Sequence, residues 1–550
     1  MRRFAASVAI ALLGLALTAG PASASSLYVT NLNDGSVSQY AVGSDGTLSP
    51  LSPAVVPAGP GHSVGIAISP DGKSVYVANI TGTISQYDVG PGGVLTPKSP
   101  ASVPAGSGAN GIAISPDGKS LYVADFGINA VSQFDVGPAG ALAPKTPATV
   151  PAGGHPDDLA VSPDGKSLYV SNEGEESVSQ FNVGAGGLLA PKSPATVPTG
   201  ETPEGIAISP DGKDLYVANY GTDDVSQFDI GPGGLLVPKS PATVPAGEGA
   251  LGIAVSPDGS SAFVGNDVAE FVSQYDIGPG GPLIPKSPPT APSVQGPDWI
   301  AVSPSGRSVY ASVFGSGVSG GGVSQYEVGS AGALAPKSPA FVAAGNGPVG
   351  VAITPDQSPA ASLSISAARA RPGVPVAFDA SASSDPDGSV ARYDWSFGDG
   401  LSVANGGPTP KHPYNKPGSY QVTVTVADNE GCSTALIFTG QTASCSGSTL
   451  ASQTQMVKVA YPGVRVKCPK SAKPHGCKFK LQALTKKRKG KAESAIAKAK
   501  AKAGRSAVVS LKPKGKFRSK LASAKKVLIR ETVTIDGINR TSFRKLKIVR

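Results

Sequence analysis

Carboxylate and amide side chains recur at one fixed place in a repeated sequence unit. The position lies two residues before the first Ile or Leu of a short apolar run, and it is polar in four copies, as Asn110, Asp157, Glu204 and Asp298. If the apolar runs surround one axis, these side chains gather at one rim of a central funnel. Their oxygens could bind a cation or a hydroxylated ligand. The alternative interpretation is a solvated polar rim without a ligand.

Few other residues of the repeated region have side chains suited to catalysis. It contains two histidines, His62 and His155, and one arginine, Arg307. Both histidines are candidate ligand-binding residues of the funnel. Residues 317–321 match the nucleophile pattern G-x-S-x-G, but they lie in a glycine-rich insertion without the strand-to-helix context that this motif requires. The sequence therefore predicts no catalytic residue.

The repeat itself predicts the elements that position these side chains. Seven copies of a unit of 47 residues fill residues 26–357. Each copy contains an apolar run ended by a turn, usually Pro-Asp-Gly, then two β-branched and aromatic runs, then a segment rich in proline and lysine. Four short runs per unit of this length are typical of a β-propeller blade. Proline and lysine place the fourth run on the exposed outer edge.

The two ends of the repeated region complement each other. The first copy begins at residues 27–31 and has no inner strand, whereas residues 350–356 form an inner strand with nothing after it. Together they make one complete blade. We therefore predict a ring of seven blades, closed by pairing one C-terminal strand with three N-terminal strands.

The segment Tyr28-Val29-Thr30-Asn31 resembles the repeat motif of the YVTN family of seven-bladed propellers. Variants of it begin at Tyr76, Tyr122, Tyr169, Tyr216 and Phe263, and the seventh copy departs from the pattern as Tyr310-Ala311-Ser312-Val313. That family is similar to archaeal surface-layer proteins and, more distantly, to seven-bladed lactonases of the 6-phosphogluconolactonase type. The resemblance implies the fold, because the matching residues are structural.

The same resemblance bears on activity. Lactonase relatives that process charged substrates line their funnel with arginine, histidine and acids, and this repeated region has few such basic residues. We therefore expect no lactone hydrolysis. A lactonase-like hydrolase with its site in the funnel remains the alternative.

The N-terminal residues have the pattern of a secretory signal peptide. Arg2 and Arg3 precede an apolar stretch over residues 4–17, and Ala22-Ser23-Ala24 supplies small residues for cleavage. The apolar stretch is too short to span a bilayer. Residues 1–24 are therefore predicted to direct secretion, and we expect no transmembrane anchor.

Residues 361–459 resemble a PKD domain, an immunoglobulin-like β-sandwich of extracellular proteins. The resemblance rests on Trp395-Ser396-Phe397-Gly398-Asp399-Gly400 and on the alternating run 420–426. It implies a spacer or interaction module, with Trp395 in the core. Asp385, Asp387 and Asp399 could gather a calcium ion, or they could be turn-forming aspartates that cap their own loops.

Residues 460–550 form a strongly basic region. It holds 28 Lys and Arg against three acids, a net charge of +25, whereas the preceding residues sum to −16. Strands are expected near 464–466, 478–484, 507–511 and 531–535, with a hairpin turn at 536–537, and 495–503 fits a strand or a helix. Outside a cell this charge suggests cell-wall polymers, acidic glycans or phospholipid headgroups as partners, and we expect no nucleic acid. The candidate contacts are Lys486, Lys487, Arg488, Lys489, Lys512, Lys514, Lys516, Arg518 and Lys520.

The four cysteines lie outside the repeated region. In a secreted chain the economical pairing is Cys432 with Cys445 and Cys468 with Cys477, which keeps each bridge within one domain. Zinc is not expected, because the Cys468–Cys477 spacing is too long for a knuckle and His475 is the only nearby histidine.

Taken together, the sequence predicts an all-β protein with a seven-bladed propeller over 25–357, a PKD sandwich over 361–459 and a small basic β-rich domain over 460–550. We expect a secreted or cell-surface protein that associates with a cell wall, binds glycans, wall polymers or surface proteins and needs no cofactor.

Overall fold

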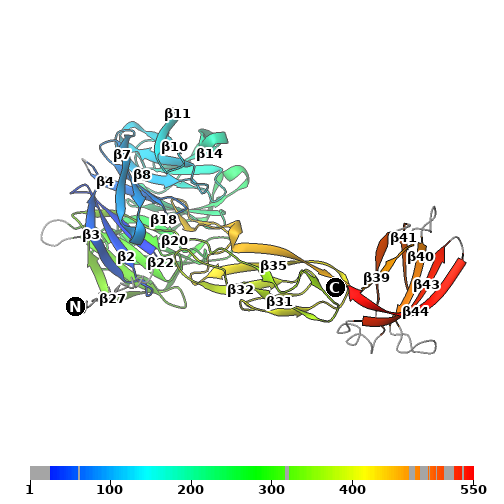
Figure 1. Cartoon of the computed structure of the whole chain (residues 1–550). Coiled ribbons are helices and arrows are strands. Elements are labelled where there is room, and N and C mark those ends of the chain that lie inside the picture. The colour runs from blue at the N-terminus through cyan, green and yellow to red at the C-terminus, as the bar shows by residue number, and fades with distance from the viewer. Residues whose placement is uncertain are drawn as a thin grey trace, which may run out of the picture. The chain divides into compact units, whose positions relative to one another are not determined.

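The computed structural model in Figure 1 is built almost entirely of β-strands. It describes residues 25–59, 62–315, 321–461, 463–469, 477–483, 494, 496–502, 505–512, 514, 526–535 and 538–549. Within these ranges no helix is long and apolar enough to cross a membrane. The proposed leader at 1–24, the lysines and arginine of 486–489, and Lys516, Arg518 and Lys520 lie outside the described residues.

Residues 25–353 form seven four-stranded antiparallel sheets, as the repeat predicts. The inner strands are β28 (Pro348–Ile353), β4 (Ser63–Ile68), β8 (Ala109–Ile114), β12 (Pro156–Val161), β16 (Pro203–Ile208), β20 (Ala250–Val255) and β24 (Pro297–Val302). The second strands are β1 (Ser25–Asn31), β5 (Ser74–Asn79), β9 (Ser120–Asp125), β13 (Ser167–Asn172), β17 (Asp214–Asn219), β21 (Ser261–Asn266) and β25 (Ser308–Val313).

The outer half of each blade continues in the same order. The third strands are β2 (Ser36–Val42), β6 (Thr83–Val89), β10 (Ala130–Val136), β14 (Ser177–Val183), β18 (Asp224–Ile230), β22 (Phe271–Ile277) and β26 (Gly322–Val328). The proline-rich outer strands are β3 (Leu48–Pro57), β7 (Leu95–Pro104), β11 (Leu142–Pro151), β15 (Leu189–Pro198), β19 (Leu236–Pro245), β23 (Leu283–Pro292) and β27 (Leu334–Ala343). Most of their side chains are exposed, which confirms their predicted place at the edge.

Single 3-10 turns connect some of these strands. They are η1 (Pro91–Gly93), η2 (Phe126–Ile128), η3 (Glu173–Glu175), η4 (Ala185–Gly187) and η5 (Pro232–Gly234), and η7 (Thr449–Ala451) lies in the later sandwich.

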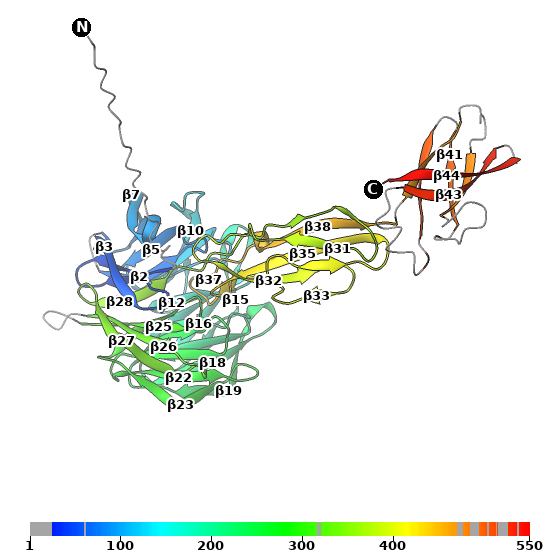
Figure 2. The same ribbon diagram turned by 60° about the horizontal axis from the view of Figure 1, so that its bottom comes forward.

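The ring closes as the sequence predicts. Strand β28 pairs antiparallel with β1, with Ile353 opposite Leu27 and Val351 opposite Val29, so the blade has the order β28-β1-β2-β3. Figure 2 shows the green β28 within the same blade as the blue β2. Pairing the last inner strand with the first blade completes that blade, so β1 is paired along both of its edges.

Each residue of the Tyr-Val-Thr-Asn motif has a structural role. The Tyr28 hydroxyl donates to the carbonyl of Gly93 in the next blade at 2.5 Å. Thr30 Oγ1 donates to the carbonyl of Val64, on the next inner strand, at 2.5 Å. Asn31 Nδ2 donates to the Ser36 and Ser38 hydroxyls of its own blade, and Val29 is fully buried. The motif therefore fastens each blade to its neighbour.

The tyrosine bond recurs around the ring with one exception. The same bond joins Tyr76 to Gly140, Tyr122 to Gly187, Tyr169 to Gly234, Tyr216 to Gly281 and Tyr310 to Gly46. Strand β21 has Phe263 at this position, which has no hydroxyl to donate. Six of the seven joints between blades therefore have this hydrogen bond.

The glutamine of Val-Ser-Gln also crosses between blades. Gln39 Nε2 donates to the Pro53 carbonyl in its own outer strand at 2.7 Å, and its Oε1 accepts from the Leu95 amide of the next outer strand at 3.0 Å. The glutamine side chain suits both contacts, because its NH2 group donates and its carbonyl oxygen accepts. The near-identity of this segment among copies thus follows from equivalent contacts.

The second unit contains an immunoglobulin-like sandwich, in agreement with the predicted PKD fold. Its sheets have the orders β29-β31-β34 and β30-β38-β35-β32-β33. The strands are β29 (Ser364–Ile365), β30 (Arg369–Ala370), β31 (Pro375–Asp379), β32 (Val390–Ser396), β33 (Ser402–Val403), β34 (Lys411–Pro413), β35 (Gly418–Asp428) and β38 (Ser452–Val459). Trp395 is buried between Phe378 and Phe397, and its indole N–H donates to the Gly407 carbonyl, so it is a core residue as expected.

The basic region forms one six-stranded sheet, in the order β41-β40-β43-β44-β39-β42. Its strands are β39 (Gly463–Lys467), β40 (Cys477–Ala483), β41 (Ala497–Ala501), β42 (Ser506–Ser510), β43 (Lys526–Ile535) and β44 (Ile538–Val549). Every predicted strand is confirmed, and the alternating Ala-Lys run is a strand rather than a helix. Ile535 of β43 pairs with Ile538 of β44, and the predicted hairpin turn at 536–537 lies outside the described residues.

Both predicted disulfides are present. Cys432 is bonded to Cys445 and Cys468 to Cys477, and none of the four cysteines is free. The second bridge lies in the core of the basic sheet with Phe479 and Leu481.

Candidate functional site

The predicted polar positions lie on inner strands, and three of them form a chain of hydrogen bonds. Asn110 of β8 donates its Nδ2 to Oδ1 of Asp157 on β12. The Asp157 carboxyl is in turn hydrogen-bonded to the carboxyl of Glu204 on β16. Asp298 of β24 is buried, and the carboxyl of Asp267 is the acidic group that acts on it. We call this end of the ring, with Asn110, Asp157, Glu204 and Asp298, the acidic mouth.

The two histidines have other partners. His62 Nδ1 lies 2.8 Å from the carbonyl oxygen of Leu32, and the side chain is exposed. His155 stacks on Phe126 with ring centroids 4.5 Å apart and is also exposed. Neither histidine has a hydrogen bond to the carboxyls of the acidic mouth among the described residues. Neither imidazole is therefore bonded to the Asp157–Glu204 pair.

Burial of several carboxyls changes the protonation of the acidic mouth. Burial raises the pKa of Asp157 to about 6, and the hydrogen bond from Glu204 opposes this rise. Burial and then the negative charge of Asp157 raise the pKa of Glu204 well above its usual value. Burial and the charge of Asp267 do the same to the pKa of Asp298. Two adjacent carboxylates repel each other, so each of Asp157 and Glu204 disfavours ionisation of the other.

The raised pKa of Asp157 predicts a pH dependence of stability. Between the usual pKa of 3.8 and about 6, the folded chain keeps a proton that the unfolded chain has lost, so stability falls as the pH rises through this window. The loss from this group is up to about 3 kcal/mol at pH 8. Asp157→Asn cannot ionise, so it should melt at a higher temperature than the wild type at pH 8 and much less so at pH 4.

Thermal melts monitored by circular dichroism between pH 4 and pH 8 test this expectation. Glu201→Gln, which removes an exposed carboxyl near the same strands, is the matched control and should leave the slope unchanged. A wild-type melting temperature that rises steadily over this range, with Asp157→Asn showing the same slope, would contradict the assignment.

Two residues that the sequence interpretation missed also lie at the mouth. The next residue along each of the seven inner strands is glycine in five copies, but it is Asp158 in one and Trp299 in another. A Cβ on Gly65 would lie 2.2 Å from the Asn110 carbonyl oxygen, and a Cβ on Gly205 would lie 2.5 Å from that of Leu251. The inner strands therefore approach closely where glycine is present. A departure from glycine at two copies was the sequence signal for these residues.

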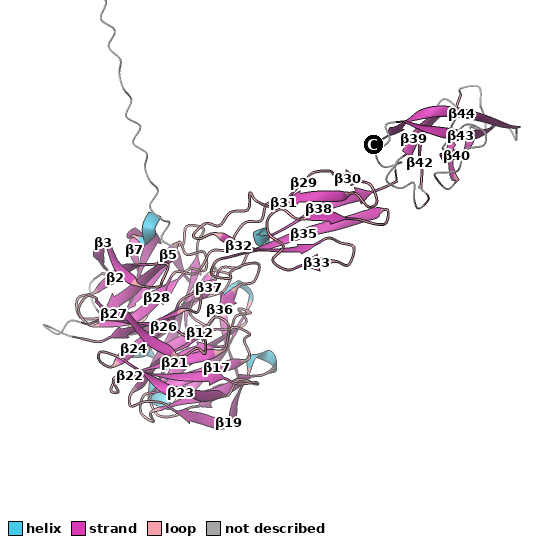
Figure 3. Cartoon of the chain, turned by 90° about the horizontal axis from the view of Figure 1, so that it is seen from below, coloured by secondary structure: helices cyan, strands magenta, loops and turns pink. Residues whose placement is uncertain are grey.

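A segment from the PKD region closes the axial channel from the other end. Contacts assign residues 430–447 to the same compact unit as the propeller, together with residues 386–388. The segment contains the short strands β36 (Ile437–Phe438) and β37 (Ala443–Cys445), and the Cys432–Cys445 disulfide joins its ends. We call residues 430–447 the plug. Figure 3 shows β36 and β37 among the propeller strands, near β12.

Backbone hydrogen bonds hold the plug against successive inner strands. The carbonyls of Thr439, Gly440 and Gln441 accept from the amides of Ile208 (3.1 Å), Val161 (2.7 Å) and Ile114 (3.2 Å), which lie on β16, β12 and β8. Thr442 Oγ1 donates to the Ile68 carbonyl of β4 at 2.8 Å. The plug thus satisfies polar backbone groups at the ends of four adjacent inner strands.

Side chains of the plug complete the closure. Phe438 and Ala443 are fully buried and pack with Leu159 and Val161 of β12. Gln441 Nε2 donates to Oδ2 of Asp158 at 2.6 Å, inside the ring. Burial and then the charge of Asp157 raise the pKa of Asp158 well above its usual value, and the hydrogen bond from Gln441 opposes this rise.

Little open space remains on the axis. A cavity of about 20 Å³ lies between Asn110, Asp158, Trp299 and Gln441, which is room for about one water molecule. The ring is therefore not an open tunnel.

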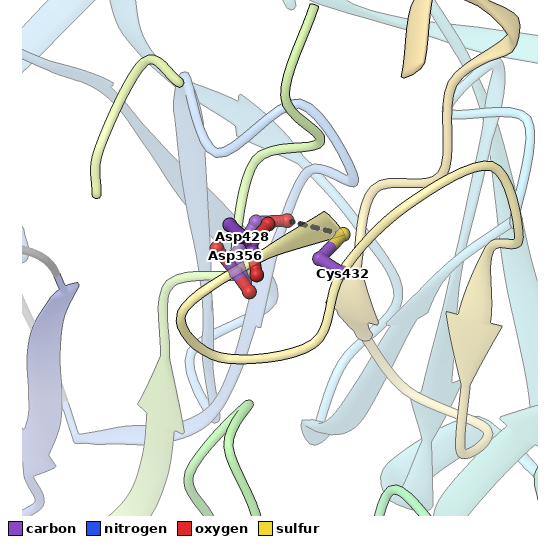
Figure 4. Close-up of side chains that lie close together, drawn as sticks. All are labelled: Asp356, Asp428 and Cys432. Atoms are coloured by element: carbon purple, nitrogen blue, oxygen red, sulfur yellow. Dashed lines mark hydrogen bonds between the residues drawn. The ribbon is translucent and has the colours of Figure 1, made fainter. Parts of the chain in front are cut away.

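The structure separates the candidate calcium ligands. Oδ2 of Asp399 lies 2.9 Å from the ring of His412, and Asp387 accepts hydrogen bonds from the Gln357 amide. Among the described residues, Asp385, Asp387 and Asp399 are not a group whose ligand atoms lie within 4.8 Å of one another. Figure 4 shows Cys432 beside Asp356, with its sulfur 3.6 Å from the Asp356 carbonyl oxygen. That sulfur is bonded to Cys445 and offers no thiolate to a metal.

Comparisons with known proteins agree with this architecture. Residues 18–279 match the family model of the seven-bladed β-propeller lactonases, and residues 356–441 match that of the PKD domain. A solved structure of a candidate 6-phosphogluconolactonase of Bacteroides fragilis aligns with a TM-score of 0.51 and 19% identity, over 60% of this chain and 97% of that chain. A similar protein of Bacteroides uniformis aligns with a TM-score of 0.51 and 19% identity, over 60% and 99%. At this identity the likeness concerns the fold.

Curated relatives match over short segments. Collagenase ColA of Clostridium perfringens is 45% identical over 56 residues, 10% of this chain and 5% of its own length. The pre-pro-metalloprotease PrtV of Vibrio cholerae is 47% identical over 49 residues, 9% of this chain and 5% of its own. The chain thus spans about one twentieth of the length of these relatives.

The fold is that of a seven-bladed propeller, similar to the lactonase family model over residues 18–279, combined with a PKD domain. The basic six-stranded sheet follows these two parts in the chain.

Proposed function

We propose that the protein is an extracellular binding protein without enzymatic activity. In this proposal the acidic mouth binds a hydroxylated ligand, such as a surface glycan, and the PKD domain is a spacer. The basic sheet attaches the protein to anionic polymers of a cell wall. The observation that carries the proposal is the closed axis, where the plug and Trp299 leave about 20 Å³. A ligand would therefore rest at a shallow mouth rather than enter a deep reaction funnel.

The chemistry of the mouth supports a neutral, hydroxylated ligand. Asp157, Glu204 and Asn110 together offer carboxyl oxygens and an amide, which can all bond to hydroxyl groups. The indole of Trp299 adds an aromatic surface that is partly exposed. A phosphorylated or carboxylated small molecule would meet the negative charge of these acids.

One observation favours a hydrolase as the second candidate. Asp157 and Glu204 are neighbouring carboxyls with raised pKa values, so one could act as a general base and the other as a general acid. The propeller is of the lactonase type, and this arrangement fits that alternative as well.

A glycan array and a lactone assay distinguish the two candidates. We expect the secreted full chain to bind a subset of neutral glycans and Asp157→Asn to weaken this binding at least 10-fold, about 1.4 kcal/mol. Glu201→Gln is the control for lost surface charge. We expect no hydrolysis of glucono-δ-lactone above background.

Two outcomes would overturn this proposal. Lactone turnover by the wild type that disappears in Asp157→Asn or Glu204→Gln would establish the hydrolase. Glycan binding that is the same in wild type and Asp157→Asn, or no glycan binding at all, would remove the acidic mouth from the binding function.

A further inference from the structure

The basic sheet presents lysines directly opposite one another on one exposed face. Lys478 of β40 pairs with Lys500 of β41, and Lys480 pairs with Lys498. All four side chains are exposed. On the same face, Lys526 of β43 pairs with Lys547 of β44. We call the exposed side of β40, β41, β43 and β44 the lysine face.

This arrangement is unfavourable for the isolated sheet. Like charges directly opposite each other on adjacent strands destabilise a sheet. In the described part of the basic region, the only acid is Glu531, and its side chain is buried beside Arg544 at 2.5 Å. No described carboxylate of this sheet therefore neutralises the lysine face. The opposite side of β40 holds the buried core, with Phe479 and Leu481, so the four lysines must point outward.

The spacing of the lysines suits a linear chain of anionic groups. Opposed side chains on neighbouring strands begin about 5 Å apart, and residues two apart along one strand are separated by about 7 Å. The ammonium groups of Lys478, Lys480, Lys498 and Lys500 thus form a compact array on two strands. Successive charges of one polymer can contact the array without a change in the sheet.

The neighbouring side chains favour an acidic polysaccharide over a nucleic acid. Thr532 and Thr534 lie opposite Lys480 and Lys478 on β43. Their hydroxyls bond to Thr541 and Asn539 of β44, and each oxygen keeps an acceptor site for a sugar hydroxyl. The aromatic ring of the lysine face in the described strands is Phe543, and the Arg530 guanidinium covers it at 5.7 Å. Single-stranded nucleic acids are usually bound by free aromatic rings on which bases stack.

We propose that the lysine face is the contact surface for a linear acidic polysaccharide that has a carboxylate on every unit. This inference rests on the proposed attachment role of the basic sheet and names its surface and partner. Lys478, Lys480, Lys498 and Lys500 supply the main contacts, rather than the sequence-predicted cluster at residues 486–489.

Two variants with equal loss of charge test this surface. The face variant combines Lys478→Gln, Lys480→Gln, Lys498→Gln and Lys500→Gln, and the control combines Lys486→Gln, Lys487→Gln, Arg488→Gln and Lys489→Gln. Binding of the full chain to immobilised polygalacturonate is measured at 0.1 M and 1 M NaCl, with neutral dextran, polyphosphate and DNA as further surfaces. We expect the face variant to bind polygalacturonate at least 10-fold more weakly than wild type, and the control within 3-fold.

Salt and thermal stability provide independent readouts. Wild-type binding should weaken steeply at 1 M NaCl, where the screening length is about 3 Å. The single variant Lys500→Glu, which places opposite charges at Lys478, should raise the melting temperature of the basic sheet at low salt while it weakens binding. This variant keeps the test valid if the fourfold variant does not fold.

Each other outcome overturns the inference in a distinguishable way. Equal weakening by both fourfold variants would show that only net charge matters, and loss in the control alone would move the contact to residues 486–489. Tighter binding to DNA or polyphosphate than to polygalacturonate would replace the partner. No wild-type retention on any polyanion would also overturn the attachment role in the proposed function.

Discussion

Replacing Pro348–Ile353 by a six-residue Gly/Ser linker is expected to destabilise the propeller by at least about 3 kcal/mol and to cause aggregation. The change removes β28, so β1 loses one of its two pairing partners and becomes an edge strand. It also removes Ile353, which is 6% exposed and packs with Leu27 and Tyr40. Urea unfolding and size-exclusion chromatography measure the two effects.

The control for this experiment is Ile353→Val, which keeps the strand and removes one methylene. It should cost only about 0.5–1.5 kcal/mol. If the linker variant remained monomeric and its urea unfolding midpoint equalled that of the wild type, closure through β28 would not contribute to stability.

Phe438→Ala is expected to release the plug from the propeller. Phe438 is fully buried against Leu159 and Val161, and truncation of such a ring costs about 3–5 kcal/mol. The amides of Ile114, Val161 and Ile208 would then lose their partners on the plug and exchange with solvent. Hydrogen exchange with mass spectrometry should therefore show faster exchange at the ends of β8, β12 and β16.

Phe314→Ala is the matched control, because Phe314 is 40% exposed on the same propeller. Its exchange pattern should match that of the wild type. Replacing Cys432 and Cys445 by serine should destabilise the plug by about 3 kcal/mol, since the bridge closes a short loop. Unchanged exchange at β12 in Phe438→Ala would show that the plug stays in place without its aromatic anchor.

The blades could be predicted from the sequence because every copy repeats the same local pattern of residues. A buried inner run, a turn and a proline-rich edge recur with one period, and residues such as Tyr28 and Gln39 make equivalent contacts in successive blades. The closure between β28 and β1 was also predictable, since the missing inner strand at one end is present at the other. Because the copies are alike, the strand pairing inferred for one blade predicts the pairing in the others.

The sequence did not predict the features that break the repeat. Asp158 and Trp299 replace glycine at a position that the search for varying polar residues passed over. The plug was invisible because it comes from a PKD-like stretch about 280 residues after Asp158, and no periodic pattern links Gln441 to that carboxyl. A contact between non-repeating segments leaves no signature in composition or spacing. The lysine face required the strand register, which fixes Lys478 opposite Lys500.

The single phenylalanine in the tyrosine series makes the ring mechanically unequal. Six joints between blades have a hydroxyl-to-carbonyl bond, and the joint between the blade of β21 and the blade of β25 has the ring of Phe263 without one. A cavity of about 550 Å³, partly lined by Phe263 and Gly332, lies along the same joint. Local opening starts where the stabilising contacts are fewest, so thermal opening of the ring should begin at this joint. The joint expected to open first thus lies away from the blade in which the two ends of the propeller chain pair.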